Sequence, residues 1–205
     1  MIYTKEVFKQ NYNLTLNQLT ITPPLPKTSY VEIPGTNEPL DLTEYFGEIF
    51  YYNQTITIRL ETLDKREVFL ANAQRLLGDI NGRKIAFKRF ETDEAYYTGR
   101  ASANIELYNF GVQAVVLTIS ASPYRQKEKT TIKKVGSGTI KLTNWQRKAR
   151  VKVTTTKSTS IEFNNNTYTF GIGSFTSDIV LDAGENMMEV STIGTTTFEY
   201  VEMGF

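Results

Sequence analysis

The sequence contains no cysteine and no histidine among its 205 residues. Without cysteine, the chain has no disulfide bonds and no thiolate metal sites. Without histidine, it lacks the commonest metal ligand and the usual general base, and no serine has a histidine to activate it. These absences exclude much enzyme chemistry, and only a carboxylate or a lysine mechanism stays open.

Long apolar runs and a strong net charge are also absent. No stretch approaches the roughly 20 apolar residues that a membrane-spanning helix requires. Met1 to Leu19 has no basic segment followed by an apolar one, so we expect no signal peptide and synthesis in the cytoplasm. The formal net charge of +1 gives no general attraction to nucleic acid.

Strand patterns dominate the first 130 residues. Ile56, Ile58 and Leu60 alternate with polar side chains, as in a half-buried strand. The run 112–121 is almost continuously apolar and predicts a strand buried on both faces. Two further strands and the turn after them are expected at Lys84 to Phe90, Tyr96 to Tyr108 and Asn109 to Gly111.

One helix is predicted, from Lys65 to Leu77. Asp64 is placed to cap it, and Leu63 and Val68 occupy the two positions of a hydrophobic staple. Gly78 marks the expected end of the helix. Its apolar stripe consists of Phe69, Ala73, Leu76 and Leu77.

Prolines are concentrated in one segment. Thr22 to Pro39 holds five of the six prolines in the chain. Because proline has no N–H to donate to a strand ladder, this segment is predicted to be an extended arm or loop and not a central strand.

The last third of the chain predicts a small β-sandwich. Asn164, Asn165 and Asn166 are expected to form a hairpin loop, since asparagine tolerates left-handed backbone. Short strands at this spacing are typical of a sandwich. The seven strands expected are 139–143, 149–155, 158–163, 167–171, 178–182, 186–191 and 196–201. We therefore expect an N-terminal domain at 1–130, a linker at 131–138 and the sandwich at 139–205.

Charge is divided unevenly along this part of the chain. Arg125 to Lys157 contains eleven basic residues and one acid, whereas Ser158 to Phe205 contains seven acids and no base. Three interpretations of the basic segment stay open: a solvated face, a contact surface for an acidic protein, or a nucleic-acid site, for which few aromatic residues are present. The charged contact surface would consist of Lys133, Lys134, Arg147, Lys148 and Arg150.

No motif predicts a catalytic, cofactor or metal site. The glycine pairs at 136/138 and 171/173 do not continue to a third glycine or open a helix, and predict turns. Two pairs of acids, Asp93 with Glu94 and Asp178 with Asp182, are the candidates for a carboxylate mechanism. Acids this close in sequence are more often found at turns and strand edges than on the two sides of a scissile bond.

An ordered set of short stretches resembles the distal tail proteins of siphophages and prophages of Gram-positive hosts. The first stretches are 31–35 (VEIPG), 40–44 (LDLTE) and 51–58 (YYNQTITI), in which Gln54 stands where the family commonly has arginine. The predicted helix, 96–100 (YYTGR), 123–124 (PY), 184–190 (GENMMEV) and 198–200 (FEY) follow in the family's order. The resemblance covers nearly the whole chain.

The resemblance implies a mainly β protein with a structural role and no enzymatic activity. Its N-terminal domain, a barrel-like sheet with one helix, is expected to form a homohexameric ring at the tail tip of the virion. A small galectin-like sandwich is expected outside the ring. The partners implied are the tail tube protein and the tail-associated lysin or baseplate hub. DNA is expected to pass through the lumen without specific binding, so Arg125 to Lys157 should not line it.

The residues expected to carry ring assembly belong to one turn and one strand. They are Pro34, Gly35, Asp41, Leu42 and Thr43 in the turn, and Ile56 and Ile58 in the strand. The alternative, that these residues only determine the fold, is weighted equally.

A second function from another class is a carbohydrate-binding module for the host cell wall. It would use Trp145, Tyr168 or Tyr200 of the sandwich as a stacking platform, although aromatic residues in strands are more often buried in the core.

Overall fold

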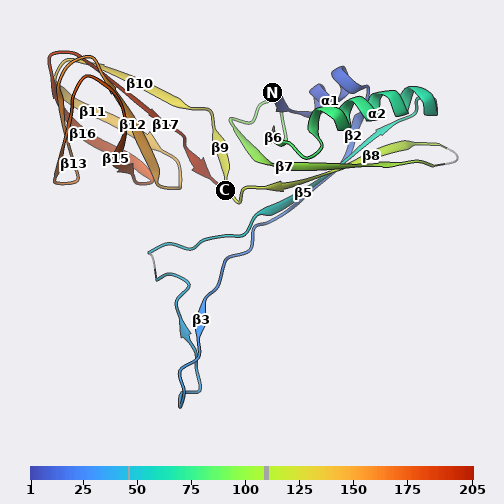
Figure 1. The fold of residues 1–205 in the computed structure, drawn as a ribbon, viewed down its shortest axis with the longest axis horizontal. Coiled ribbons are helices and arrows are strands. Elements are labelled where there is room, and N and C mark those ends of the chain that lie inside the picture. The colour runs from blue at the N-terminus through green and yellow to red at the C-terminus, as the bar shows by residue number, and fades with distance from the viewer. Residues whose placement is uncertain (46, 109–110) are drawn as a thin grey trace. The chain divides into compact units, whose positions relative to one another are not determined.

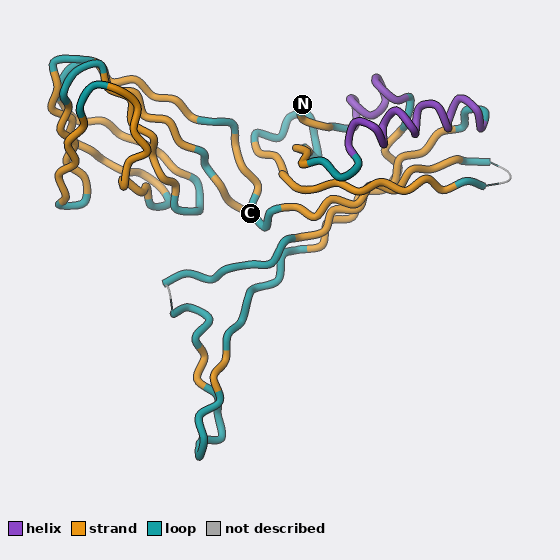
Figure 2. Tube along the Cα trace, in the orientation of Figure 1, coloured by secondary structure: helices purple, strands orange, loops and turns teal. Residues whose placement is uncertain are grey.

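The structure, a computed structural model, describes residues 1–45, 47–108 and 111–205. The chain divides into two compact units, unit 1 (Met1–Pro123) and unit 2 (Tyr124–Phe205). Both are built mainly from strands, as predicted (Figures 1 and 2). In the described part of the chain, no helix is both long and apolar enough to cross a membrane. The predicted turn at Asn109 to Gly111 lies partly outside the described residues.

Unit 1 is a sheet curled into a half-barrel, with two helices packed on one face (Figure 1). Its strands lie in the order β1-β6-β7-β8-β5-β2. β1 and β6 are parallel, and the other neighbours in this order are antiparallel. The elements are β1 (Ile2–Tyr3), α1 (Lys5–Tyr12), β2 (Thr15–Thr22), β5 (Gln54–Thr62), α2 (Arg66–Ile80), β6 (Lys84–Phe87), β7 (Ala95–Glu106) and β8 (Gln113–Ala121).

β5 and β8 form the centre of this sheet. In β5 the alternating side chains of Ile56, Ile58 and Leu60 are fully buried, which confirms the predicted half-buried strand. The prediction that the apolar run 112–121, which forms β8, is buried on both faces is wrong. In β8 the side chain of Leu117 is buried, but Thr118 is only partly buried and Ser120 is exposed. The reason is that the helices cover one face of the sheet alone.

The predicted helix is present as α2, with different ends. Three residues of the predicted apolar stripe, Phe69, Ala73 and Leu76, are fully buried, as expected. Leu77 is only partly buried, and Ile80, which was not predicted, is the fourth fully buried residue of the helix. The helix continues through Gly78, and Asp64 does not cap it, because Asp64 accepts a hydrogen bond from the Asn13 side chain at 2.5 Å instead. The staple positions, Leu63 and Val68, are exposed.

Helix α1 was not predicted, so unit 1 has two helices where one was expected. The hydroxyl oxygen of Thr4 accepts a hydrogen bond from the Val7 N–H at 3.4 Å, and Asn13 ends the helix in the left-handed conformation. Within it only Phe8 and Tyr12 are buried. Two buried positions in eight residues give too short a pattern to identify a helix from periodicity.

Unit 2 is a β-sandwich of two four-stranded sheets, β10-β17-β12-β15 and β11-β16-β13-β14, around one core. The seven predicted strands are all present, and Asn164 and Asn165 both have positive φ in the predicted hairpin loop. A short pair, β9 (Arg125–Lys127) with β18 (Met203–Gly204), completes the unit. The sandwich strands are β10 (Thr130–Val135), β11 (Gly138–Asn144), β12 (Ala149–Thr155), β13 (Thr159–Phe163), β14 (Asn166–Phe170), β15 (Gly173–Leu181), β16 (Gly184–Thr192) and β17 (Thr195–Tyr200).

The division between the units differs from the predicted boundary. It falls after Pro123, and most of the segment expected to be a linker, 131–138, belongs to strand β10. β10 pairs with β17 along its whole length, and Ile132 packs against the sandwich core. One inward apolar residue between two threonines and two lysines is too weak a pattern to predict a strand.

Candidate functional site

Residues 23–53, here called the arm, leave the sheet of unit 1 between β2 and β5 (Figures 1 and 2). Its two halves run side by side. Backbone hydrogen bonds join Lys27 N–H to Phe50 at 2.7 Å and Tyr52 N–H to Leu25 at 2.9 Å. Further out, β3 (Tyr30–Val31) pairs with β4 (Leu40–Asp41). The proline-rich segment is therefore an extended arm, as predicted.

Five of the predicted assembly residues lie in the outer half of the arm. Pro34 and Gly35 belong to its terminal turn, where Gly35 has a φ of +87°. Asp41, Leu42 and Thr43 lie on the returning half, where the Asp41 carboxylate accepts a hydrogen bond from the Thr43 N–H at 2.8 Å. Hydrogen bonds from the Thr43 hydroxyl and backbone hold the pKa of the Asp41 carboxyl below its usual range. The residues thus form one ordered segment.

The other two predicted residues, Ile56 and Ile58, are not part of this segment. Both are fully buried in the core of unit 1. A side chain with no exposed surface cannot touch a neighbouring subunit, so the structure places them where they determine the fold.

The arm also carries a feature that the sequence analysis did not single out. Many of its large apolar side chains are exposed, although backbone hydrogen bonds join its two halves at several points. They are Leu25, Tyr30, Val31, Ile33, Leu40, Tyr45, Phe50 and Tyr52. The sequence did contain a signal, since so many large apolar residues in a proline-rich segment are unusual for a solvated loop. Exposed apolar surface of this kind makes the arm the candidate interaction site of unit 1.

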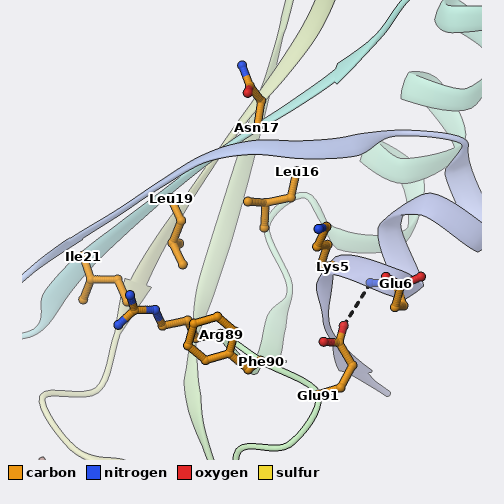
Figure 3. Close-up of a pocket in the computed structure, with 9 residues that line it drawn as sticks. All are labelled: Lys5, Glu6, Leu16, Asn17, Leu19, Ile21, Arg89, Phe90 and Glu91. Carbon is orange, nitrogen blue, oxygen red and sulfur yellow. Dashed lines mark hydrogen bonds between the residues drawn. The ribbon is translucent and has the colours of Figure 1, made fainter.

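A groove of about 660 Å³ lies in unit 1 beside the edge strand β2 (Figure 3). One wall is apolar, with Leu16, Leu19 and Ile21 of β2. Across it, a carboxylate oxygen of Glu91 accepts a hydrogen bond from the Glu6 N–H in the first turn of α1, at 3.2 Å. The Glu91 and Glu6 backbone N–H groups hold the pKa of the Glu91 carboxyl below its usual range. This carboxylate therefore accepts a hydrogen bond from the N-terminal turn of the helix.

The predicted charged contact surface is not one patch. Lys133 and Arg150 lie on the outer face of the same sheet. Across β17, Lys133 is aligned with Thr154 of β12. Arg150 lies four residues away from Thr154 on that strand. At the usual rise per residue this separates Lys133 and Arg150 by about 13 Å along the strand direction, and β17 lies between their two strands. Arg147 lies over the Tyr124 ring at 4.6 Å, and the Lys148 ammonium is 3.9 Å from the Asp182 carboxylate. Lys134 lies next to the turn between β10 and β11.

Basic and acidic parts of unit 2 pair with each other inside the unit. The Glu199 carboxylate lies 2.6 Å from the Lys129 ammonium and 3.4 Å from that of Lys152. Hydrogen bonding from Lys129, followed by that from Lys152, lowers the pKa of the Glu199 carboxyl. Pairs of Lys141 with Glu185 and of Lys127 with Glu202 join the same two parts. Several of the basic and acidic side chains of unit 2 therefore form ion pairs with each other within one sandwich.

The aromatic residues considered for carbohydrate stacking do not form a platform. Tyr200 is buried and its hydroxyl donates a hydrogen bond to the Thr143 carbonyl at 2.7 Å. Tyr168 is partly buried against the sandwich core. Trp145 is partly covered, with the Arg125 guanidinium 5.5 Å from its ring centre and Gly204 in close contact.

The structure gives the acids considered for catalysis structural contacts or exposed positions. The Asp93 carboxylate accepts a hydrogen bond from the Phe90 N–H at 3.2 Å, within a turn. Asp182 lies near Lys148, and Asp178 is exposed on β15. Among the residues that the structure describes, no group of three or more Asp or Glu side chains is placed to hold a metal ion.

Comparison with known proteins gives a strong likeness in structure. No protein-family model matches the sequence, and no curated protein matches it. A designed double-stranded β-helix aligns with a TM-score of 0.27, too low for any inference. The crystal structure of the Dit protein (gp 19.1) of phage SPP1 aligns with a TM-score of 0.68 at 10% sequence identity, over 94% of each chain. That protein is described as a paradigm of the hub adsorption apparatus in phages that infect Gram-positive bacteria. The chain therefore has, over nearly its whole length, the fold of a phage Dit protein.

Proposed function

We propose that this chain is a structural protein of a phage tail tip. It assembles as a homohexameric ring that connects the tail tube protein to the tail-associated lysin or baseplate hub, and it has no catalytic role. The observation that carries the proposal is the fold likeness to the SPP1 Dit protein, which covers 94% of both chains. Because the likeness includes both units, it supports the same role for the whole chain.

The exposed surfaces of unit 1 support assembly by protein contact. β2 is an edge strand of the sheet, and edge strands present unpaired backbone groups to other chains. The arm adds exposed apolar side chains on a backbone whose two halves are joined by hydrogen bonds at several points. In this proposal unit 1 makes the ring, and the galectin-like sandwich lies outside it.

DNA passes through the ring in this proposal without specific binding. A lumen lined with cations would retain DNA through counterion release. Several cations of the basic segment, among them Lys129, Lys141 and Lys152, are paired with carboxylates of unit 2. We therefore expect a density map of the ring to show Arg125 to Lys157 away from the channel, and a map with these side chains in the lumen would contradict this.

The position in the virion is tested by labelling. An antibody raised against the purified chain, with a gold conjugate, is applied to particles of the phage that encodes it. Labels at the distal end of the tail are expected. Labels along the tail shaft or on the capsid, or particles that lack the chain altogether, would overturn the proposed role.

A further inference from the structure

One end of the sandwich is formed by four turns held together by hydrogen bonds. The strand registers bring Lys134, Thr196, Thr155 and Gly173 into one row across the first sheet. The Gly136 N–H donates to the Gly194 carbonyl at 2.8 Å, and the Thr156 N–H donates to the Thr195 carbonyl at 3.0 Å. The Ser137 hydroxyl donates to the Thr192 carbonyl at 2.9 Å. We call this surface the sandwich end.

Three aliphatic side chains project from the sandwich end. Ile193 is 92% exposed, Val135 is 77% exposed and Ile172 is 71% exposed. Their turns are tied to the sheets by the hydrogen bonds above and, for Ile172, by the bond from the Thr155 hydroxyl to the Gly171 carbonyl. Apolar side chains held in water on a well-bonded surface mark a contact with another protein.

The rim of the sandwich end is basic. The Lys134 ammonium lies 3.4 Å from the position that a Cβ on Gly138 would take, so it belongs to the first turn. The stem of Lys157 lies 2.8 Å from the same position on Gly194, next to Ile193. None of the four turns contains Asp or Glu. The surface therefore fits a partner that is both aliphatic and acidic.

The outer half of the arm has this chemistry. Val31 is paired with Leu40, and Ile33 follows Val31 at the two-residue spacing that places both on one face. Their exposed fractions are 46% for Val31, 49% for Leu40 and 44% for Ile33. The arm contains five acids and one base, a net charge of −4. A two-stranded ribbon is marginally stable unless its apolar face packs on something, so this face needs a cover.

We propose that the outer half of the arm of one copy docks on the sandwich end of a second copy. Val31, Ile33 and Leu40 pack against the exposed aliphatic residues of the sandwich end, and Glu38, two residues before Leu40, faces Lys134 and Lys157. The apolar contact supplies affinity, and the opposite charges set its orientation. Because two different surfaces meet, the contact is heterologous and repeats from copy to copy, as a ring requires. This inference takes from the proposed function only the premise that copies of the chain associate with one another.

Cross-linking tests the contact directly, since the chain has no cysteine. Full-length Ile33→Cys and Ile193→Cys chains, carrying different tags, are mixed and oxidised. We expect a covalent product that contains both tags. Leu63→Cys mixed with Ile193→Cys is the matched control, because Leu63 is 84% exposed and outside both surfaces. If the amount of mixed product does not exceed that in this control, the inference is overturned. A chain with both cysteines that links only within itself would also overturn it.

Charge exchange gives a second test. One variant carries Lys134→Glu and Lys157→Glu, and the other carries Glu38→Lys. Each alone is expected to associate about tenfold more weakly than the wild type, whereas an equal mixture restores association because every contact is again between opposite charges. A mixture no better than either variant would overturn the inference. If the wild type still forms rings in that case, the proposed function stands, and a wild type that never associates counts against both.

Discussion

At the scale of single residues, Gly99 of β7 lies directly against the backbone of β8. A Cβ on Gly99 would lie 2.5 Å from the Ala121 Cα and still closer to the Ser120 carbonyl oxygen. We predict that Gly99→Ala lowers the free energy of unfolding by about 1–3 kcal/mol or more. Gly78→Ala is the control, since a Cβ there meets nothing within 4 Å in a helix, and it should raise stability by roughly 0.5–1 kcal/mol. Urea unfolding measures both, and equal stability of Gly99→Ala and wild type would contradict the packing described.

Glu199 makes the sandwich sensitive to acid. Its carboxyl has a lowered pKa in the folded state, chiefly through Lys129. Its contribution is therefore fully present above the ordinary value of 4.5 and is lost as pH falls through the lower folded value. We predict that wild-type stability falls more steeply below this pH than that of Glu199→Gln, measured by thermal unfolding across a pH series. Glu185→Gln is the control, because Glu185 and its partner Lys141 are 64% and 52% exposed, and such pairs contribute little. Parallel curves for wild type and Glu199→Gln would refute the prediction.

Residue types and spacing identified the arm segment but not its neighbours in space. Pro34, Gly35 and Asp41 were selected from the resemblance to the distal tail family, and the structure places them in one ordered segment. Ile56 was selected from the same resemblance and lies in the core. The sandwich end escaped prediction because Val135 and Ile193 are far apart in sequence, and only strand register brings their turns together.

At the scale of elements, α2 stabilises unit 1 through one stripe. Phe69 is fully buried in that stripe, whereas its neighbour Val68 is 49% exposed. We predict that Phe69→Ala lowers the free energy of unfolding by about 3–5 kcal/mol. Val68→Ala should change it by less than about 1 kcal/mol, because little area is lost and alanine favours helix. Denaturant midpoints from circular dichroism give both values, and similar losses in the two variants would contradict the assigned packing face.

Elements whose apolar residues recur several times with one period were predictable from the sequence. Elements that are short, or that have few apolar residues, were not. The seven sandwich strands follow a two-residue period and the α2 stripe follows the helical period, so local sequence was sufficient. Strand β10 has a single inward aliphatic residue, Ile132, and its pairing with β17 comes from a distant part of the chain. The burial of β8 on one face only was also outside local pattern, because it depends on which face the helices cover.

At the scale of the whole molecule, the order of elements carries more information than any motif. The chain shares 10% identity with the SPP1 Dit protein, yet the two folds align over 94% of each chain. Sequence stretches predicted this fold through their order, while their individual matches were weak. In the proposed assembly, contacts between copies depend on exposed residues such as those of the arm, for which periodicity gives no rule.

The central claim, that this chain forms a ring, is tested most directly by its mass in solution. Light scattering on the purified full-length chain after size exclusion, with negative-stain images of the same peak, gives mass and shape together. The account predicts six subunits, or twelve for two rings back to back, with a central hole. A single subunit across a wide range of concentrations, with no ring in the images, would contradict it.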